Sequence, residues 1–286
     1  METARTLHRQ LTTDSHTTSL PIPSLSWLTT LIPSTTSRNI PPLPSLLATA
    51  RLRLLSSDLS TPGLLDPSYV SSHSFPASLT SGQQHPPTGY PKDQSLPQDV
   101  LVQVLDIVNL SRSKWEVVEE LESIERGEQT RGREVIRLPT TSNSDPNDPN
   151  DGVDMGDGGT QTQLNTTTTT ATTTAQQQQA AAQAKERKNA THKLTLQDPS
   201  GQRLYALELK RIEEIAVPQF VNEKMVGGTP IGCKLLLKKG TKVARGVVLL
   251  EPGMVKVLGG RVEGWGRVWE QGRLERVRGE VQAQRG

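Results

Sequence analysis

Residues 245–260 read Arg-Gly-Val-Val-Leu-Leu-Glu-Pro-Gly-Met-Val-Lys-Val-Leu-Gly-Gly, and they carry the clearest structural pattern in the chain. Val247 to Leu250 form a continuous aliphatic run that is too short for a helix and typical of a buried core strand. Pro252 suits the first turn of a helix, because its fixed φ is already helical. The next apolar run ends at Gly259-Gly260, where the backbone is free to turn. We therefore expect a buried strand, a helical turn and a second apolar segment.

Upstream, the first strand is predicted at Val100 to Val108. Both of its faces are largely apolar, which suits a barrel wall that is covered on its outer side. A helix is predicted next, over residues 113–124, with Ser113 as its cap and acidic side chains facing solvent. Its inward stripe is expected to be Trp115, Val118, Leu121 and Ile124.

A hairpin is predicted on either side of Asp198-Pro-Ser-Gly201, because proline presets one turn dihedral and glycine closes the turn. Apolar residues alternate with polar ones in both flanking segments. The positions expected to face inward are Leu194, Leu196, Tyr205, Leu207 and Leu209. Glu208 and Lys210 are then expected to face solvent, as is His192 beside the first of these strands.

Two more strands complete the set. Residues 231–237 alternate with Cys233 inward, Lys239-Gly240 turns the chain, and Val243 to Leu250 returns. Five strands with this spacing predict a mainly β fold, a small closed OB-fold barrel accompanied by helices. A further helix is expected within 262–277, on which Trp265 and Trp269 lie.

The composition limits how much of the chain can form this core. Only 33% of residues are apolar and 3% aromatic, which supports about one small domain. We expect a disordered tail over 1–23, a small helical segment over 24–66 and a linker over 67–95. The OB-fold domain then spans 96–280 and contains an insertion over 111–190. Within that insertion, residues 139–190 are rich in Thr, Gln and Asp-Pro-Asn and predict disorder.

No catalytic constellation is visible in the sequence. The five histidines are scattered without metal-ligand spacing, and Cys233 is expected to be a buried structural thiol. The glycine-rich residues 227–234 lack the order of a phosphate-binding loop. We therefore predict no enzyme activity, cofactor, metal or small-molecule substrate. No segment has the pattern of a signal peptide or a membrane span, so no membrane association is expected.

The charge is unevenly divided along the chain. Residues 184–286 hold 20 basic and 11 acidic residues, a net charge of +9, whereas residues 1–183 carry −7. A basic half is compatible with weak, salt-sensitive attraction to single-stranded DNA, and equally with an ordinary solvated surface. A stacking platform is not expected, because Tyr205 is placed in the core. The candidate nucleic-acid-binding residues are Lys234, Lys238, Lys239, Lys242 and Arg245.

Residues 246–260, with the Val-Lys-Val-Leu-Gly-Gly string, resemble the RecQ-mediated genome instability protein 1 family. Val-Leu-Asp-Ile-Val-Asn-Leu-Ser at 104–111 and the hairpin at 193–210 extend the resemblance. Arg131-Gly-Arg-Glu-Val-Ile-Arg137 looks like the form seen in fungal relatives. Together the matching parts cover about 98–125 and 190–275.

The resemblance implies a nuclear, non-catalytic OB-fold subunit that partners topoisomerase III and a RecQ-type helicase. In such proteins, the insertion after the first strand reaches the DNA gate of the topoisomerase. This contact supports decatenation and the dissolution of double Holliday junctions in DNA repair, recombination and replication. The implied partner-binding residues are Ser113, Trp115, Val118, Lys256, Gly259 and Gly260. The family places a proline before the aromatic residue, where this chain has Ser113.

Two questions remain open at the level of sequence. The apolar residues of the helix at 113–124 either anchor a partner or pack against the chain's own barrel. The protein is either the regulatory subunit described above or an autonomous single-stranded DNA-binding protein.

Overall fold

The computed structural model describes residues 2–32, 41–80, 93–127, 190–221 and 224–283. Residues 1–122 and 190–286 form one compact unit, and residues 123–189 form a second. The predicted disordered stretch at 139–190 lies outside the described residues, apart from Ala190, which is buried in the first unit. The fold and the sites below belong to the first unit.

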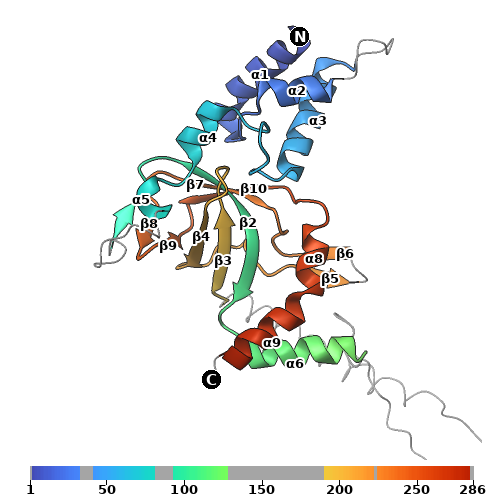
Figure 1. Ribbon diagram of the computed structural model, residues 1–286, viewed down its shortest axis with the longest axis vertical. Helices are drawn as coiled ribbons and strands as arrows, with labels where there is room; N and C mark the ends of the chain where they lie inside the picture. Colours follow the sequence, from blue (N-terminus) through green and yellow to red (C-terminus); the bar gives the residue numbers. More distant parts are fainter. Residues whose placement is uncertain (1, 33–40, 81–92, 128–189, 222–223, 284–286) are drawn as a thin grey trace, which may run out of the picture. The chain divides into compact units, whose positions relative to one another are not determined.

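An eight-stranded sheet forms the centre of this unit (Figure 1). All of its neighbouring strands are antiparallel except β4 and β9, which are parallel. The strands, in spatial order, are β1 (Gln94–Ser95), β8 (Lys242–Ala244), β9 (Val247–Leu250), β4 (Arg203–Glu208), β3 (His192–Gln197), β2 (Val100–Asn109), β7 (Lys234–Leu237) and β10 (Val255–Gly259). A separate hairpin pairs β5 (Gln219–Val221) with β6 (Lys224–Gly227).

Each of the five predicted strand segments contains a strand, and β9, β4, β3, β2 and β7 are neighbours in the sheet. The prediction of a closed five-stranded barrel is nevertheless too simple. Strands β1, β8 and β10 extend the sheet, and its two edge strands do not pair with each other in the described residues. The sheet curls around a single apolar interior without a closed ring of backbone hydrogen bonds.

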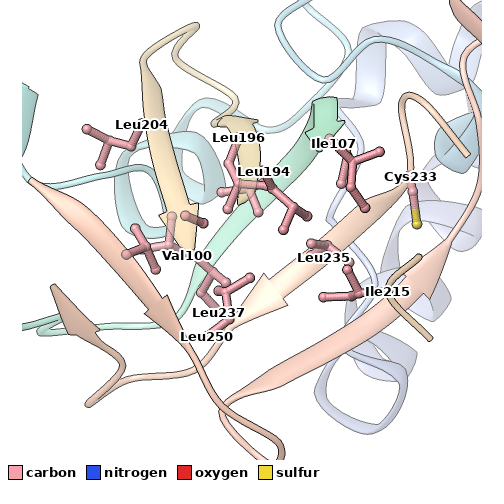
Figure 2. Close-up of a cluster of buried hydrophobic side chains, with 14 of the residues drawn as sticks. Val100, Ile107, Leu194, Leu196, Leu204, Ile215, Cys233, Leu235, Leu237 and Leu250 are labelled. Carbon is pink, nitrogen blue, oxygen red and sulfur yellow. The ribbon is translucent and has the colours of Figure 1, made fainter. Parts of the chain in front are cut away.

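The interior is filled by aliphatic side chains that alternate along the strands. Figure 2 shows Leu194 and Leu196 of β3 pointing toward Leu235 and Leu237 of β7. Cys233 is fully buried in the same cluster, as predicted for a structural thiol. Burial raises its pKa to about 11, which keeps the thiol protonated and unreactive.

The segment at 245–260 contains two tight turns that its apolar pattern conceals. Arg245 and Gly246 both have positive φ, 49° and 77°, and form a two-residue turn that splits the predicted strand into β8 and β9. The predicted helical turn at Pro252 is wrong. Pro252 and Gly253 form a β-turn closed by the Met254 N–H on the Glu251 carbonyl at 3.1 Å, because Gly253 has φ 85°. The second apolar run is strand β10.

Before the first long strand, the described residues form the helices α1 (Glu2–Thr18), α2 (Leu25–Leu31), α3 (Leu43–Ser56), α4 (Pro67–His73) and α5 (Ala77–Thr80). The small helical segment predicted over 24–66 contains α2 and α3. The Trp27 N–H donates to the capping hydroxyl of Ser24 at the start of α2, at 3.1 Å.

Helix α1 corrects the prediction of a disordered tail over 1–23. Ala4, Leu7 and Leu11 lie on one helical face and are buried against Leu28 of α2 and Ala50 of α3. The low apolar content of residues 1–23 hid this narrow stripe.

The predicted linker over 67–95 contains α4 and α5, so that prediction is also wrong for its described part. Residues 81–92 lie outside the described residues. Tyr69 of α4 is buried, and Phe75 and Leu79 join the interior of the sheet. The Phe75 N–H donates to Asp198 Oδ2 in the β3–β4 turn at 2.8 Å, which fastens this segment to the hairpin.

The predicted C-terminal helix is present in two parts, α8 (Trp265–Gln271) and α9 (Arg273–Ala283), which meet at Gly272. Trp269 is buried in the sheet cluster, and its Nε1 donates to Asp106 of β2 at 2.5 Å. The C-terminal helices are thereby tied to the first long strand.

Helix α3 rests on the end of β10 through a glycine. Gly260 has φ 83°, and a Cβ added to it would lie 2.3 Å from the Leu55 carbonyl oxygen. Neighbouring Gly259 has φ 80°, but a Cβ there would meet nothing within 4 Å. Gly260 therefore permits close approach of two backbones, and Gly259 only permits a turn.

We expect Gly260→Ala to destabilise the fold more than Gly259→Ala. Both variants carry the strain of a positive φ, about 1–2 kcal/mol, but only Gly260→Ala drives a methyl group into the Leu55 carbonyl. Urea unfolding followed by circular dichroism measures the free energy of unfolding of each variant. Equal losses in the two variants would contradict a close contact between α3 and the end of β10.

Candidate functional site

The first candidate surface is the start of the insertion, where helix α6 (Lys114–Glu125) follows β2. Ser113 Oγ accepts the Glu116 N–H at 3.1 Å, and the Glu116 carboxylate accepts the Ser113 N–H at 2.9 Å. This reciprocal pair is a capping box, which satisfies two backbone donors that the helix itself leaves open. The structure thus confirms Ser113 as the cap and gives it a local role in starting the helix.

The apolar stripe of α6 is divided between the interior and the surface. Val118 is buried, whereas 56% of Trp115 is exposed. The prediction that both residues face inward is therefore wrong for Trp115. Val118 in turn is inaccessible to a partner in this structure, so its predicted contact role is not supported. Ion pairs from Lys114 to Glu280, 2.8 Å, and from Glu122 to Arg278, 2.7 Å, join α6 to α9.

The second candidate surface is the end of β10, where the other predicted partner-binding residues lie. Lys256 Nζ donates to Ser19 Oγ just after α1, at 3.1 Å, and Gly260 lies against Leu55 of α3. Figure 1 shows β10 beside α3, with α6 at the opposite end of β2. The structure therefore places Lys256, Gly259 and Gly260 together but separates them from Trp115. Lys256 therefore contacts the residue that follows α1, and Gly260 lies against α3.

Four of the five predicted nucleic-acid-binding residues are exposed, and Lys234 is not. Lys234 is fully buried, and its Nζ donates to the Gly232 carbonyl at 2.7 Å. Burial lowers the pKa of Lys234 to about 8, against the opposing effect of the nearby Asp58 carboxylate. The alternating pattern that placed Lys234 on the surface fails, because β7 is covered on both faces.

A buried polar network continues from this lysine to the helical segment. Gln103 Nε2 donates to Asp58 Oδ1 at 2.6 Å and to Gln197 Oε1 at 3.0 Å. Gln103 Oε1 accepts the Leu59 N–H at 3.0 Å. Burial alone would raise the pKa of Asp58, but hydrogen bonds from Gln103 and Ser60 outweigh it and lower that pKa. The network fixes the chain after α3 on the sheet.

In a second buried cluster, β4 turns inward the residues that were predicted to face solvent. Glu208 is buried, and its Oε2 lies 2.7 Å from His192 Nδ1. Its Oε1 accepts from Arg211 at 2.9 Å and from the Ile212 N–H at 2.5 Å. Burial alone would raise the pKa of Glu208, but the hydrogen bonds from His192, the Ile212 N–H and Arg211 lower it.

The prediction that His192 and Glu208 face solvent is thus wrong, and Leu204 and Ala206 replace Tyr205 and Leu207 in the interior. Tyr205 is 54% exposed. One signal in the sequence pointed to this arrangement, since His192 is in phase with the inward residues Leu194 and Leu196.

Within the described part of the chain, no group of three or more His, Cys, Asp or Glu residues is arranged to hold a metal ion. The helices there include none that is both long and apolar enough to cross a membrane. His192 and Arg211 both contact the buried carboxylate of Glu208. These three side chains form hydrogen bonds with one another and with the backbone, so we assign them a structural role.

The strand order, with parallel β4 and β9, and the preceding helices define a class of OB-fold protein with an N-terminal helical domain. Residues 75–273 match the family model "RMI1, N-terminal OB-fold domain", and residues 16–62 match "RMI1, N-terminal helical domain". The chain belongs to this family, RecQ-mediated genome instability protein 1.

A curated relative supports the assignment. The chain is 28% identical over 183 residues to "RecQ-mediated genome instability protein 1" of Schizosaccharomyces pombe, a match that covers 64% of this chain. The same match spans 64% of the length of the relative.

We expect the stability of the protein to rise between about pH 8 and 10 because of Lys234. Its pKa is about 8 in the folded chain and near the ordinary 10.5 when unfolded, so the unfolded state binds more protons in this window. Stability then increases with pH, by at most about 1.4 kcal/mol per pH unit. Urea unfolding at several pH values measures this slope.

Lys234→Met should lack this contribution, and Lys238→Met, at an exposed lysine, should retain it. Identical pH slopes for the wild-type protein and Lys234→Met would contradict a lowered pKa of Lys234 in the folded protein.

Proposed function

We propose that this protein is a non-catalytic subunit of a nuclear complex of topoisomerase III and a RecQ-type helicase. Its role is to promote decatenation and the dissolution of double Holliday junctions, and so to maintain the genome. The observation that carries the proposal is the match of residues 16–62 and 75–273 to the two N-terminal domains of the RMI1 family. The name of the S. pombe relative, which links it to RecQ and genome instability, supports it.

The start of the insertion offers a defined contact point for the topoisomerase. The insertion leaves the sheet between β2 and β3, and its first helix is fixed by the Ser113 capping box and the ion pairs to α9. Trp115 lies in the first turn of that helix with 56% of its surface exposed. Large aromatic side chains on rigid elements are typical centres of protein interfaces.

Such a contact regulates a partner without an active site. A protein that binds the open and closed states of a DNA gate with different affinities shifts their populations by that difference. In our proposal Trp115 and the insertion that follows supply the differential contact. Lys256 and Gly260 contribute from a distance, because they hold the helical domain against the sheet.

We expect Trp115→Ala to weaken binding of topoisomerase III from the same organism by roughly 30-fold or more, the effect of losing about 2 kcal/mol at an interface centre. Pull-down and calorimetric titration measure the affinity, and a kinetoplast DNA assay measures decatenation. Leu110→Ala is the matched control, because Leu110 is 48% exposed in the same connection.

Two outcomes would contradict the proposal. One is wild-type affinity and decatenation with Trp115→Ala. The other is normal stimulation by a variant that lacks residues 111–190 altogether, since the insertion would then have no part in the gate.

A further inference from the structure

A cavity opens on the surface of the helical domain, between α1 and the start of α2. Its volume is about 350 Å³. The residues that line it are Arg5, His8, Arg9, Thr12, Thr13 and Leu25. Those of α1 recur three and four positions apart, so they form one face of the helix. One wall is therefore basic and polar, and the other is the side chain of Leu25, which is 44% exposed.

The two arginines of this cavity are not neutralised by the described part of the chain. Arg5 and Arg9 are exposed and form no ion pair with a described carboxylate. They are one helical turn apart, so both guanidinium groups can contact the same anion. Glu2 lies one turn before Arg5 and limits the basic stretch on that side. The cavity thus offers two positive charges over a short length of helix.

Local hydrogen bonds restrict what the other polar groups can do. Thr12 Oγ1 donates to the His8 carbonyl at 2.8 Å, and Thr13 Oγ1 donates to the Arg9 carbonyl at 2.9 Å. Both hydroxyl protons are engaged, so these oxygens have only lone pairs left for a ligand. His8 Nε2 is buried without a hydrogen-bond partner among the described residues. The cavity therefore combines guanidinium donors with hydroxyl acceptors.

We propose that this cavity binds a phosphorylated serine or threonine side chain of a partner protein. Arg5 and Arg9 pair with the phosphate, whose charge of about −1.5 to −2 at neutral pH matches their combined charge. Arginine clusters recognise phosphorylated motifs in other domains by the same chemistry. Thr12 and Thr13 accept backbone N–H groups of the peptide, and Leu25 packs against an apolar residue beside the phosphorylated one. The inference goes beyond the proposed function and does not depend on it.

Other anionic ligands fit the cavity less well. A nucleic-acid strand requires cations along successive phosphates and rings on which bases stack, whereas the described lining has two arginines beside Glu2 and contains no Phe, Tyr or Trp. A membrane surface requires a wide apolar helix face, but the apolar residues Ala4, Leu7 and Leu11 of α1 are buried within the helical domain. A single carboxylate would neutralise only one of the arginines.

The test is fluorescence anisotropy of the full chain with a labelled mixture of short peptides. Each peptide has a central phosphoserine followed by leucine, with random residues elsewhere. Removal of the phosphate should weaken binding by at least about tenfold, and so should Arg5→Gln or Arg9→Gln, because each change removes charge-assisted hydrogen bonds. Arg9→Lys should lie between Arg9→Gln and the wild type, since lysine keeps the charge but loses the two-pronged geometry.

The matched control is Arg53→Gln, at an exposed arginine of α3 that does not line the cavity, and it should bind like the wild type. Thermal melting of each variant checks folding, which the exposed Arg5 and Arg9 should leave unchanged.

Three outcomes would overturn the proposal. The first is equal affinity for the phosphorylated and unphosphorylated mixtures, or for a mixture with glutamate in place of phosphoserine. The second is wild-type affinity of the double variant Arg5→Gln/Arg9→Gln, because the phosphate would then bind elsewhere. The third is binding of oligo(dT) or of phosphatidylserine vesicles that the double variant abolishes while phosphopeptide binding is unchanged. The arginines would then serve a nucleic acid or a membrane.

Discussion

The buried carboxylate of Glu208 is the constraint on which the rest of the sheet depends. It is enclosed with His192 and Arg211, and it accepts hydrogen bonds at both oxygens. An unpaired charge at this depth would cost several kcal/mol, so β4 can bury Glu208 only in the one register that supplies these donors. A shift of one residue would exchange the two faces of the strand. The paired carboxylate therefore keeps Leu204 and Ala206 inside and Tyr205 outside.

A second polar contact attaches the helical segment to this sheet. Gln103 links Asp58 and Leu59, in the chain after α3, to Gln197 of β3. At the far end of α3, Gly260 allows the helix carbonyl of Leu55 to approach β10. Of the glycine pair that marks the family in sequence, Gly260 thus has a packing role in this chain. It joins the helical domain to the OB-fold domain, as well as ending a strand.

The polar side chains that the sheet buries are bonded within the chain, whereas two large aromatic side chains are exposed. Trp115 lies on a capped helix at the start of the insertion, and Tyr205 lies beside Lys193 on the sheet. These two exposed aromatic side chains belong to different elements, one in the insertion and one in the sheet.

The sequence by itself determined the family, the positions of the five central strands, the helices α2, α3, α6 and those near the C-terminus, and the burial of Cys233. Apolar periodicity and turn residues are local, so one segment suffices to reveal them. Only the tertiary structure decided that β4 faces the other way, that Lys234 is covered, and that α1 packs on α2 and α3. Each of these depends on a partner distant in sequence, such as His192 for Glu208 or Leu28 for Leu7. A local sequence pattern cannot show whether a charged side chain has a hydrogen-bonding partner elsewhere in the chain that allows its burial.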